Sequence, residues 1–395
     1  MGFNIWTDYP RVPITQLLEF IVDNRGKTVP TAPSGHKLIA TNCVTNNTLF
    51  PLYEKVRYLS DETYRTWFRS HPIPGDILFV NKGTPGRVCM VPDPIDFCIA
   101  QDMIALRADD SKIYNKYLFT VLRSHEIQQQ IYNTNVGDVI PHFKKQFMDQ
   151  LLIPVPDRKV QEAIGDLYYA LSYKVEHNKK INDNLQQQLH LLFIQIFNGI
   201  SEDVVLGDVV ETTSGGTPSR KHTEYYENSS ICWVKSKELL GNYILDTEEH
   251  INDMALSKSS AKLLPMHSVL IAMYGATVGA YGIISKSMTC NQAVCALLCN
   301  EKYPYTYLFQ IAQEQQQKLI NMAVGSAQQN ISQVLIKQLP LHSDIAAIRK
   351  FHNLALPLHK QIEKLQAENR TLSEMRDTLL PQLMSGKLDV SDIEL

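Results

Sequence analysis

The chain has 395 residues, of which 44% are apolar and 20% charged, so it is long enough for two or more globular domains. No run approaches the roughly 18 apolar residues of a membrane span, and the N-terminal MGFNIWTDYPRVP has no basic region followed by an apolar core. The net charge of −3 excludes a uniformly basic protein, although local charge decides what a surface binds.

The cysteines indicate the cellular compartment, and the local charges indicate where a polyanion could bind. Seven cysteines, an odd number, lie in apolar runs such as CNQAVCALLC (290–299), which is typical of buried thiols in a reducing compartment. We therefore expect a cytoplasmic protein without a membrane partner. Segment 25–87 carries nine Lys or Arg against four acids, whereas 374–395 carries two against five. The basic segment is either a place where a polyanion binds or a solvated face with chance clustering.

The sequence repeats itself at a separation of about 190 residues, which indicates a tandem duplication. A glycine turn followed by a β-branched run occurs at KGTPGRVCMV (82–91) and again at YGATVGAYGI (274–283). Other matched pairs keep the same order, namely KLIATN (37–42) with CWVKSK (232–237), AQDMIAL (100–106) with NQAVCAL (291–297), YLF (117–119) with YLF (307–309), and LLIPVP (151–156) with KQLPLH (337–342).

Each copy contains short β-branched or aromatic runs punctuated by Gly and Pro, followed by a long stretch with helical periodicity. We predict an α+β protein in which β-rich domains at 1–156 and 201–341 alternate with helical segments at 157–200 and 342–395. The apolar positions of both helical segments recur every seven residues, which predicts two helices that pack together as a coiled coil. The first series is Ile164, Leu171, Asn178, Leu185 and Leu192, and the second is Phe351, Leu358, Leu365, Leu372 and Leu379.

Polar and proline residues interrupt these series. Asn178 and Asn369 occupy seam positions, where an amide can fix the register or lie at a solvated end. Pro357 predicts a kink or a new start in the second helix, and Pro381 followed by Gly386 predicts its end.

A search for catalytic motifs finds none that is complete. The string RGKT (25–28) resembles a phosphate loop, but the required glycine is replaced by Ile21. The three cysteines of 290–299 have neither C-x-x-C spacing nor a matching histidine pair, so we predict no metal site. We predict no catalytic residue either. Two similar modules without an active site favour binding, and an approximate two-fold suits a pseudo-palindromic partner such as duplex DNA.

Several longer stretches carry a family resemblance: GDVVETTSGGTPSRKHTEYY (207–226), WVKSKEL (233–239), SSAKLLPMHSVLIAMYGATVGAYGI (259–283) and LLPQLMSGKL (379–388). They resemble the specificity subunits of type I restriction-modification systems, and the likeness covers nearly the whole chain. The resemblance implies two target-recognition domains and two long helices that pack antiparallel as a spacer. Each domain would recognise one half-site of a bipartite duplex DNA target.

The resemblance also implies that the chain has no catalysis or cofactor of its own. Modification (methyltransferase) subunits that use S-adenosylmethionine and restriction subunits that use ATP and Mg would supply the chemistry. The first domain departs more from the pattern, with RGKTVP (25–30) where the second has SGGTPS (214–219). The resemblance still implies the same fold for the first domain, and it implies different side chains because each recognition domain reads a different half-site.

Candidate DNA contacts lie on the loops that carry these motifs. The glycines would allow close backbone approach, or are ordinary hairpin glycines. Lys and Arg would neutralise phosphates or bind guanine, or are simply solvated at the surface. The amides would bind adenine, or form hydrogen bonds within a buried turn. His142, Gln328 and Gln329 lie in the matching late loops IPHF and AQQN, and Tyr274 would stack or cover the sheet. The full set is Lys82, Gly83, Thr84, Arg87, Gln101, His142, Thr217, Ser219, Arg220, Lys221, Lys235, Lys237, Tyr274, Thr277, Asn291, Gln292, Gln328 and Gln329.

Two other classes of function remain open at this point. A stand-alone nuclease or methyltransferase would need a carboxylate set or cofactor loop that the sequence does not show. A coiled-coil scaffold would explain the helices, but not two β-rich modules with basic loops. Salt-dependent binding of duplex DNA by the purified chain distinguishes a DNA-binding protein from a scaffold.

Overall fold

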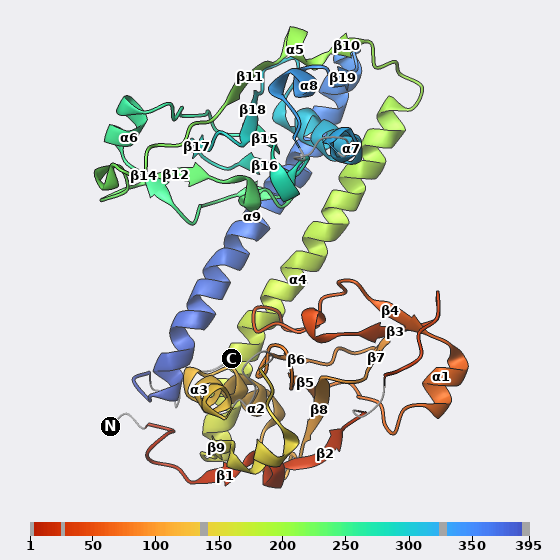
Figure 1. Cartoon of the computed structure of the whole chain (residues 1–395), viewed down its shortest axis with the longest axis vertical. Helices are drawn as coiled ribbons and strands as arrows, with labels where there is room; N and C mark the ends of the chain where they lie inside the picture. The colour runs from red at the N-terminus through yellow and green to blue at the C-terminus, as the bar shows by residue number, and fades with distance from the viewer. Residues whose placement is uncertain (1–3, 25–27, 135–140, 324–329, 389–395) are drawn as a thin grey trace. The chain divides into compact units, whose positions relative to one another are not determined.

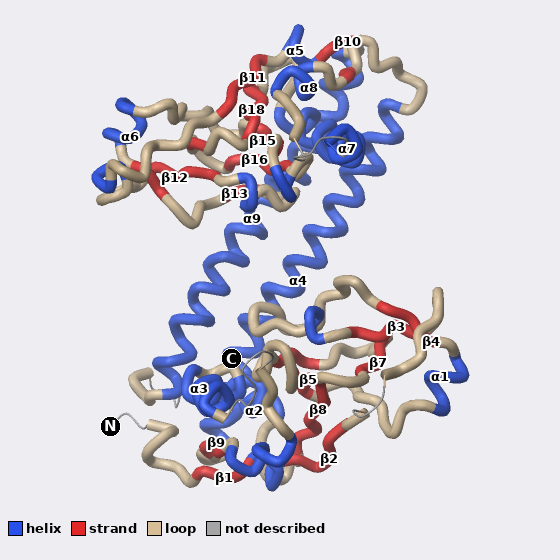
Figure 2. Tube along the Cα trace, viewed as in Figure 1, coloured by secondary structure: helices blue, strands red, loops and turns tan. Residues whose placement is uncertain are grey.

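The computed structural model describes residues 4–24, 28–134, 141–323 and 330–388. The chain divides into two compact units, one of residues 1–178 with 368–395 and one of residues 179–367. Each unit contains one β-rich domain and a part of each of two long helices (Figure 1). Figure 2 shows the same division by secondary structure, with the strands confined to the two domains.

The described part of the first domain contains short strands and short α-helices. Its strands are β1 (Arg11–Pro13), β2 (Leu18–Val22), β3 (His36–Ile39), β4 (Arg57–Leu59), β5 (Ile77–Val80), β6 (Val88–Met90), β7 (Phe97–Ile99), β8 (Met103–Ala108) and β9 (Leu152–Pro154). Its helices are α1 (Asp61–Thr66), α2 (Asn115–Leu122) and α3 (His125–Asn133). The strands form sheets in the orders β2-β8-β5-β6, β4-β3-β7 and β1-β9.

The second domain contains the same kinds of sheet. Its strands are β10 (Val204–Val205), β11 (Glu211–Ser214), β12 (Ile231–Val234), β13 (Tyr243–Ile244), β14 (His250–Ile251), β15 (Val269–Ala272), β16 (Tyr281–Ile284), β17 (Thr289–Cys290), β18 (Val294–Leu298) and β19 (Pro340–Leu341). Its helices are α5 (Leu206–Val209), α6 (Asp253–Lys258), α7 (Tyr305–Ala323) and α8 (Gln333–Lys337). The sheets have the orders β11-β18-β15-β16-β13, β14-β12-β17 and β10-β19.

The two domains correspond strand by strand, which confirms the tandem duplication. The order β2-β8-β5-β6 matches β11-β18-β15-β16, to which the second domain adds β13, and β4-β3-β7 matches β14-β12-β17. The repeated YLF tripeptides lie at matching places in α2 and α7. The Tyr117 hydroxyl donates to the Pro154 carbonyl at 2.9 Å, and the Tyr307 hydroxyl accepts from the His342 backbone N–H at 3.0 Å. Both tyrosines therefore tie a helix to the segment that leads into a long helix.

The long helices are α4 (Arg158–Phe197) and α9 (Ile345–Met384), each of 40 residues. In the first unit the Arg376 guanidinium of α9 lies 5.8 Å from the ring centre of Tyr168 on α4. In the second unit the rings of Phe193 and Phe351 lie 5.5 Å apart. An early part of α4 thus meets a late part of α9 and the reverse, so the helices run antiparallel, as the sequence and the resemblance together predicted.

The buried stripe of this helix pair is displaced from the predicted heptads. Of the first series Ile164 and Asn178 are buried, and of the second Phe351 and Leu365; the other six positions are half-buried. Seven positions that lie three or four residues from members of these series are buried instead, namely Tyr168, Val175, Leu189, Ile348, Ala355, Ile362 and Leu383. The reason is that residues near the helix ends are also part of the domain cores, so the buried face of each helix includes positions that pack on a domain.

Asn178 is fully buried, and both its amide nitrogen and its amide oxygen lack a hydrogen-bond partner in the part of the chain that the structure describes. Of the two roles left open by the sequence, a solvated end of the seam is therefore excluded for Asn178. A buried amide without partners costs about 1 to 3 kcal/mol. The helix pair thus carries a local instability at this residue.

Of the two outcomes predicted at Pro357, a new start of the helix is wrong, because α9 continues through both Pro357 and Pro381. Pro357 removes the hydrogen bond to the carbonyl of Asn353, but both residues are exposed, so water can satisfy that carbonyl. The helix ends near Gly386, which has φ +66°, and the Lys387 N–H closes the last turn on the Gln382 carbonyl at 3.0 Å.

Candidate nucleic-acid interface

The glycine turns have the same backbone construction in both domains. Each follows a central strand, β5 or β15, and leads back into its antiparallel neighbour, β6 or β16. The Gly86 N–H donates to the Val80 carbonyl at 3.0 Å, and the Gly279 N–H donates to the Ala272 carbonyl at 3.0 Å. Both turns are therefore tight and closed by equivalent bonds.

The two glycines of each turn differ in their surroundings. Gly83 and Gly275 have φ values of +87° and +69°, and a Cβ added at either would meet nothing within 4 Å. Gly86 and Gly279 also have positive φ, but a Cβ there would meet Gln128 and Ile131 of α3, or Gln316 and Ile320 of α7. The first glycine of each turn is thus an open tip, while the second packs against a helix. An open glycine tip is suited to close approach by another backbone.

The late loops contact these turns in both domains. Lys82 forms a β-bridge with His142, and Tyr274 forms the equivalent bridge with Asn330. The Gly83 N–H also donates to the Pro141 carbonyl at 3.0 Å. His142 is half-buried and Tyr274 is exposed. Gln328 and Gln329 lie outside the described residues.

A third loop, the one with the amides, joins each pair. The Asn81 N–H donates to the Asp102 carbonyl at 2.9 Å, and the Met273 N–H donates to the Ala293 carbonyl at 2.8 Å. Gln101 and Asn291 are half-buried and Gln292 is exposed. The Asn291 side-chain oxygen accepts a hydrogen bond from the Ala293 N–H at 3.2 Å, so this amide stabilises its own turn, which was the alternative to a DNA contact.

We call this combination the three-loop edge: residues 81–87, 101–102 and 141–143 in the first domain, and 273–280, 291–293 and 330–331 in the second. The first-domain edge holds Lys82, Gly83, Thr84, Arg87, Gln101 and His142 of the predicted set. The second-domain edge holds Tyr274, Thr277, Asn291 and Gln292. Equivalent backbone bonds therefore gather side chains from three separated segments in each domain.

The remaining predicted residues of the second domain lie on segment 217–237. The Gly216 N–H donates to the Cys290 carbonyl at 3.0 Å, which attaches the start of this segment beside the amide loop. Thr217, Ser219, Arg220, Lys221 and Lys237 are exposed, and Lys235 is half-buried. The Arg220 guanidinium lies over the Tyr226 ring at 4.4 Å from its centre, a cation–π contact that orients it.

Three of these four cations are paired with carboxylates, which the sequence analysis did not foresee. Glu249 makes ion pairs with both Arg220 and Lys235, and Glu248 pairs with Lys237 at 2.5 Å. The hydrogen bond from Lys235, followed by that from Arg220, lowers the pKa of Glu249. The prediction that these cations neutralise phosphates is therefore incomplete, because a phosphate would have to replace a carboxylate that already pairs with the cation. No spacing rule links Glu249 to residues 14 and 29 positions earlier, so the sequence offered no signal for these pairs.

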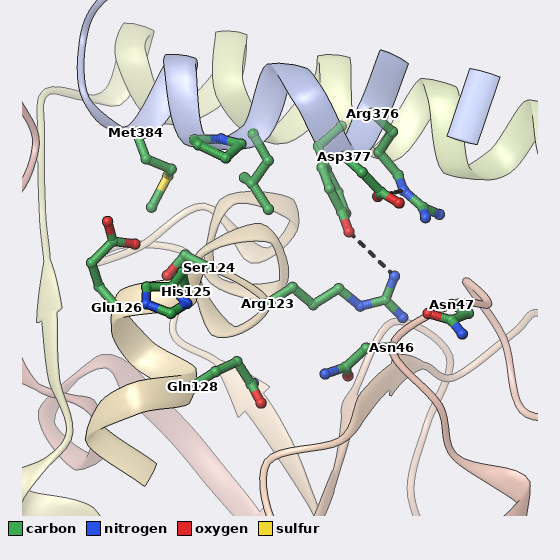
Figure 3. A pocket seen from close by; sticks show the side chains of 13 residues that line it. Asn46, Asn47, Arg123, Ser124, His125, Glu126, Gln128, Arg376, Asp377 and Met384 are labelled. Atoms are coloured by element: carbon green, nitrogen blue, oxygen red, sulfur yellow. Dashed lines mark hydrogen bonds and ion pairs between the residues drawn. The ribbon is translucent and has the colours of Figure 1, made fainter. Parts of the chain in front are cut away.

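A pocket of about 400 Å³ lies in the first unit, where the α2–α3 junction meets the end of α9 (Figure 3). The buried Arg123 donates to the Thr48 carbonyl at 2.5 Å, the Val88 carbonyl at 2.9 Å and the Tyr168 hydroxyl at 3.5 Å. Arg376 is paired with Asp377 at 2.8 Å. Each guanidinium thus makes bonds within the protein, although the buried Nε of Arg123 has no hydrogen-bond partner among the described residues.

All seven cysteines are free thiols, and six of them are buried. Burial raises the pKa of Cys290, Cys295 and Cys299 to about 12 in each case. These thiols are therefore protonated and unreactive at neutral pH. Within the described ranges, no helix is both long enough and apolar enough to cross a lipid bilayer.

Two matched domains that each carry a three-loop edge define a protein built from two equivalent modules. A model of the type I restriction modification DNA specificity domain matches residues 29–187 and again residues 200–342. These matches cover most of the chain, which therefore belongs to the type I restriction-modification DNA specificity family. Two such domains in tandem fit the recognition of a target in two parts.

Individual known proteins resemble this chain over most of its length. The MjaIX type I restriction enzyme specificity subunit of Methanocaldococcus jannaschii is 22% identical over 355 residues, covering 81% of this chain and 79% of that protein. The HindI specificity subunit of Haemophilus influenzae is 19% identical over 400 residues, covering 80% and 86%. The crystal structure of a type I S subunit from M. genitalium superimposes with a TM-score of 0.59 at 16% identity, covering 95% of this chain and 96% of that chain.

Proposed function

We propose that the chain is the DNA-recognition subunit of a type I restriction-modification complex, in which each domain binds one half-site of a bipartite duplex target. The observation that carries this proposal is the occurrence of the three-loop edge twice, built by equivalent backbone bonds but bearing different side chains. Equivalent construction favours the same kind of partner for both domains, and different side chains favour different base sequences.

The chemistry of the two edges suits duplex DNA. The first carries Lys82 and Arg87 beside open glycine and threonine positions. The second carries amides and an exposed tyrosine, with a cluster of charge-paired cations attached to it. Contacts from Lys and Arg to phosphates would position each domain, and amide or guanidinium groups would contact base edges.

We further propose that α4 and α9 set the number of unread base pairs between the half-sites, and that this chain supplies no catalysis. Modification subunits that use S-adenosylmethionine, and restriction subunits that use ATP and Mg, would carry out the reactions. The relatives are named as specificity subunits, and the motif search found no catalytic set. Both points support a role limited to recognition and recruitment.

The first experiment is methylome sequencing of a host that expresses the chain with its cognate modification subunits, compared with a host in which it is deleted. We expect a bipartite methylated motif that disappears on deletion. A demonstrably assembled complex without such a motif would contradict the proposal.

A second experiment tests the spacer role of the helices. Inserting one heptad into α4 and one into α9 keeps the seam in phase and lengthens the pair by about 10 Å, which corresponds to about three base pairs. The spacer should grow by that amount while both half-sites remain unchanged. The matched control inserts seven residues into loop 198–203, where the spacing should not change. Altered half-sites at constant spacing would refute this role.

A further inference from the structure

Three residues of the second domain with metal-binding side chains lie together, although no sequence motif connects them. Cys232 on β12 and His250 on β14 are direct cross-strand partners in antiparallel register. Asp246 lies four residues before His250, in the loop that follows β13. The Asp246 Oδ1 atom is 3.2 Å from the Cys232 Sγ and 2.9 Å from the His250 Nε2.

These distances are close to those that a metal ion requires. The three ligand atoms all lie within 4.8 Å of one another. In a tetrahedral zinc site with bonds of about 2.0 to 2.3 Å, neighbouring ligand atoms are separated by roughly 3.3 to 3.8 Å. Adjustments of about an ångström or less in side-chain position would therefore create three of the four coordination positions. Among the residues that the structure describes, no other group of three His, Cys, Asp or Glu side chains meets this distance criterion.

The ligand types select a particular class of ion. A thiolate, an imidazole and a carboxylate are the donors that Zn²⁺ uses, whereas Mg²⁺ and Ca²⁺ take oxygen ligands. One thiolate and one carboxylate also balance the two positive charges of the ion. Cys232 is 1% exposed, but the side chains of Asp246 and His250 are each 29% exposed. The cluster is therefore anchored on its buried side and open to solvent on the other, where an ion can enter and a water molecule can be the fourth ligand.

We propose that Cys232, Asp246 and His250 bind one Zn²⁺ ion. Binding releases the proton of the Cys232 thiol to solvent, and His250 coordinates through the unprotonated Nε2 of its neutral imidazole, whose proton then lies on Nδ1.

The fold itself does not demand such a cluster, because the first domain lacks it. At the corresponding place, β3 and β4 pair Lys37 with Tyr58. Lys37 makes an ion pair with Asp96 at 2.5 Å. A lysine and a tyrosine do not form a zinc site, so the first domain serves as a natural negative control within the same chain.

Zinc binding would act on the candidate DNA interface through the loop 245–249. This loop carries Glu248 and Glu249, whose carboxylates hold Lys237, Lys235 and Arg220. An ion that joins Asp246 to β12 and β14 would fix the loop and with it the positions of those cations. This consequence rests on the proposed DNA-recognition function, whereas the metal site does not.

The test uses the metal-free full-length chain titrated with Co²⁺, which reports thiolate ligation by a charge-transfer absorption band. We expect one equivalent of Co²⁺ to produce the band and one equivalent of Zn²⁺ to abolish it. Cys232→Ser should remove the band and lower Zn²⁺ affinity by more than the roughly 100-fold typical for loss of a supporting group. The matched controls are Cys299→Ser and His222→Gln, which change the same residue types elsewhere in the second domain and should retain the band.

A second measurement protects the test against a variant that fails to fold. Zn²⁺, but not Mg²⁺, should raise the thermal unfolding midpoint of the unaltered chain, and His250→Gln should lose this increase. The absence of a thiolate band in the unaltered chain, or its persistence in Cys232→Ser, would overturn the metal site. If the band appears but the chain with its partner subunits specifies no DNA motif, the metal site stands and the proposed function fails.

Discussion

The ion pairs of Glu249 with Arg220 and Lys235 predict that removal of this carboxylate increases the affinity for DNA by freeing two cations. Glu249 holds both Arg220 and Lys235, and Glu248 holds Lys237 alone. If these cations lie on the DNA-binding surface, Glu249→Gln releases two of them and Glu248→Gln releases one. Both substitutions should therefore strengthen binding of duplex DNA and make it more dependent on salt.

The magnitude follows from the number of cations released. Each new phosphate contact steepens the slope of log K against log salt by about 0.9. Glu249→Gln should thus steepen the slope by up to about 1.8, and Glu248→Gln by up to about 0.9. At about 0.1 M salt these limits correspond to increases in affinity of roughly 60-fold and 8-fold relative to a 1 M reference. The ratio between the two variants is the sharper quantity, because it depends only on the pairing seen in the structure.

The assay is fluorescence anisotropy of a labelled duplex with the purified full-length chain over about a tenfold range of salt. The control is Glu162→Gln on α4, which makes the same change in net charge away from segment 217–237. Its partner Arg158, whose Nε lies 2.9 Å from the Glu162 carboxylate, keeps a second ion pair with Asp110 at 3.0 Å. The slope of this control should match that of the unaltered chain. An unchanged or shallower slope for Glu249→Gln would refute the placement of these cations on the interface.

Three further predictions concern stability. Gly275→Ala should lower the free energy of unfolding by only the cost of a left-handed backbone, about 1 to 2 kcal/mol. Gly279→Ala should lower it further in urea unfolding, because its Cβ would lie 3.0 Å from a side-chain carbon of α7. Equal losses for the two variants would contradict this packing. Burial lowers the pKa of His359 to about 3, so below about pH 6.5 this histidine binds a proton in the unfolded chain but not in the folded one. The free energy of unfolding should therefore fall by about 1.4 kcal/mol between about pH 7.5 and 5.5. His359→Gln should remove this part of the pH dependence, and an identical pH profile for the variant would refute the reasoning. Asn178→Leu should raise the unfolding free energy by about 1 to 3 kcal/mol, and a loss of stability would show that the buried amide has a partner.

The sequence predicted the duplication, the β-rich character of the domains and the long helices because these features depend on local patterns. Seven-residue periodicity identifies a helix that packs on another helix, and a glycine turn before a β-branched run identifies a hairpin, wherever the partner lies. The failure at Pro357 is instructive in the same terms. Proline weakens a helix locally, but Asn353 and Pro357 are exposed residues, so water can satisfy the freed carbonyl, and the neighbouring Phe351, Ala355 and His359 are buried.

The sequence did not predict which charges meet. Glu249 contacts residues 14 and 29 positions away, and Cys232 meets His250 only because β12 and β14 pair in one particular register. A shift of that register by one residue would separate the two side chains onto opposite faces of the sheet. Sequence spacing therefore excluded a metal motif among Cys290, Cys295 and Cys299, but carried no information about a cluster assembled across strands.

The comparison of the two domains within one chain separates what positions a loop from what a loop can bind. The bonds that close the three-loop edge, such as Gly86 to Val80 and Gly279 to Ala272, join backbone atoms and do not depend on side-chain identity. The side chains at the same places differ, with Lys82 in the first domain where the second has Tyr274. A scaffold of this kind can accept new side chains at the edge without loss of the bonds that place them. Recognition should therefore change by substitution at the edge while the spacing, which depends on the helices, stays constant.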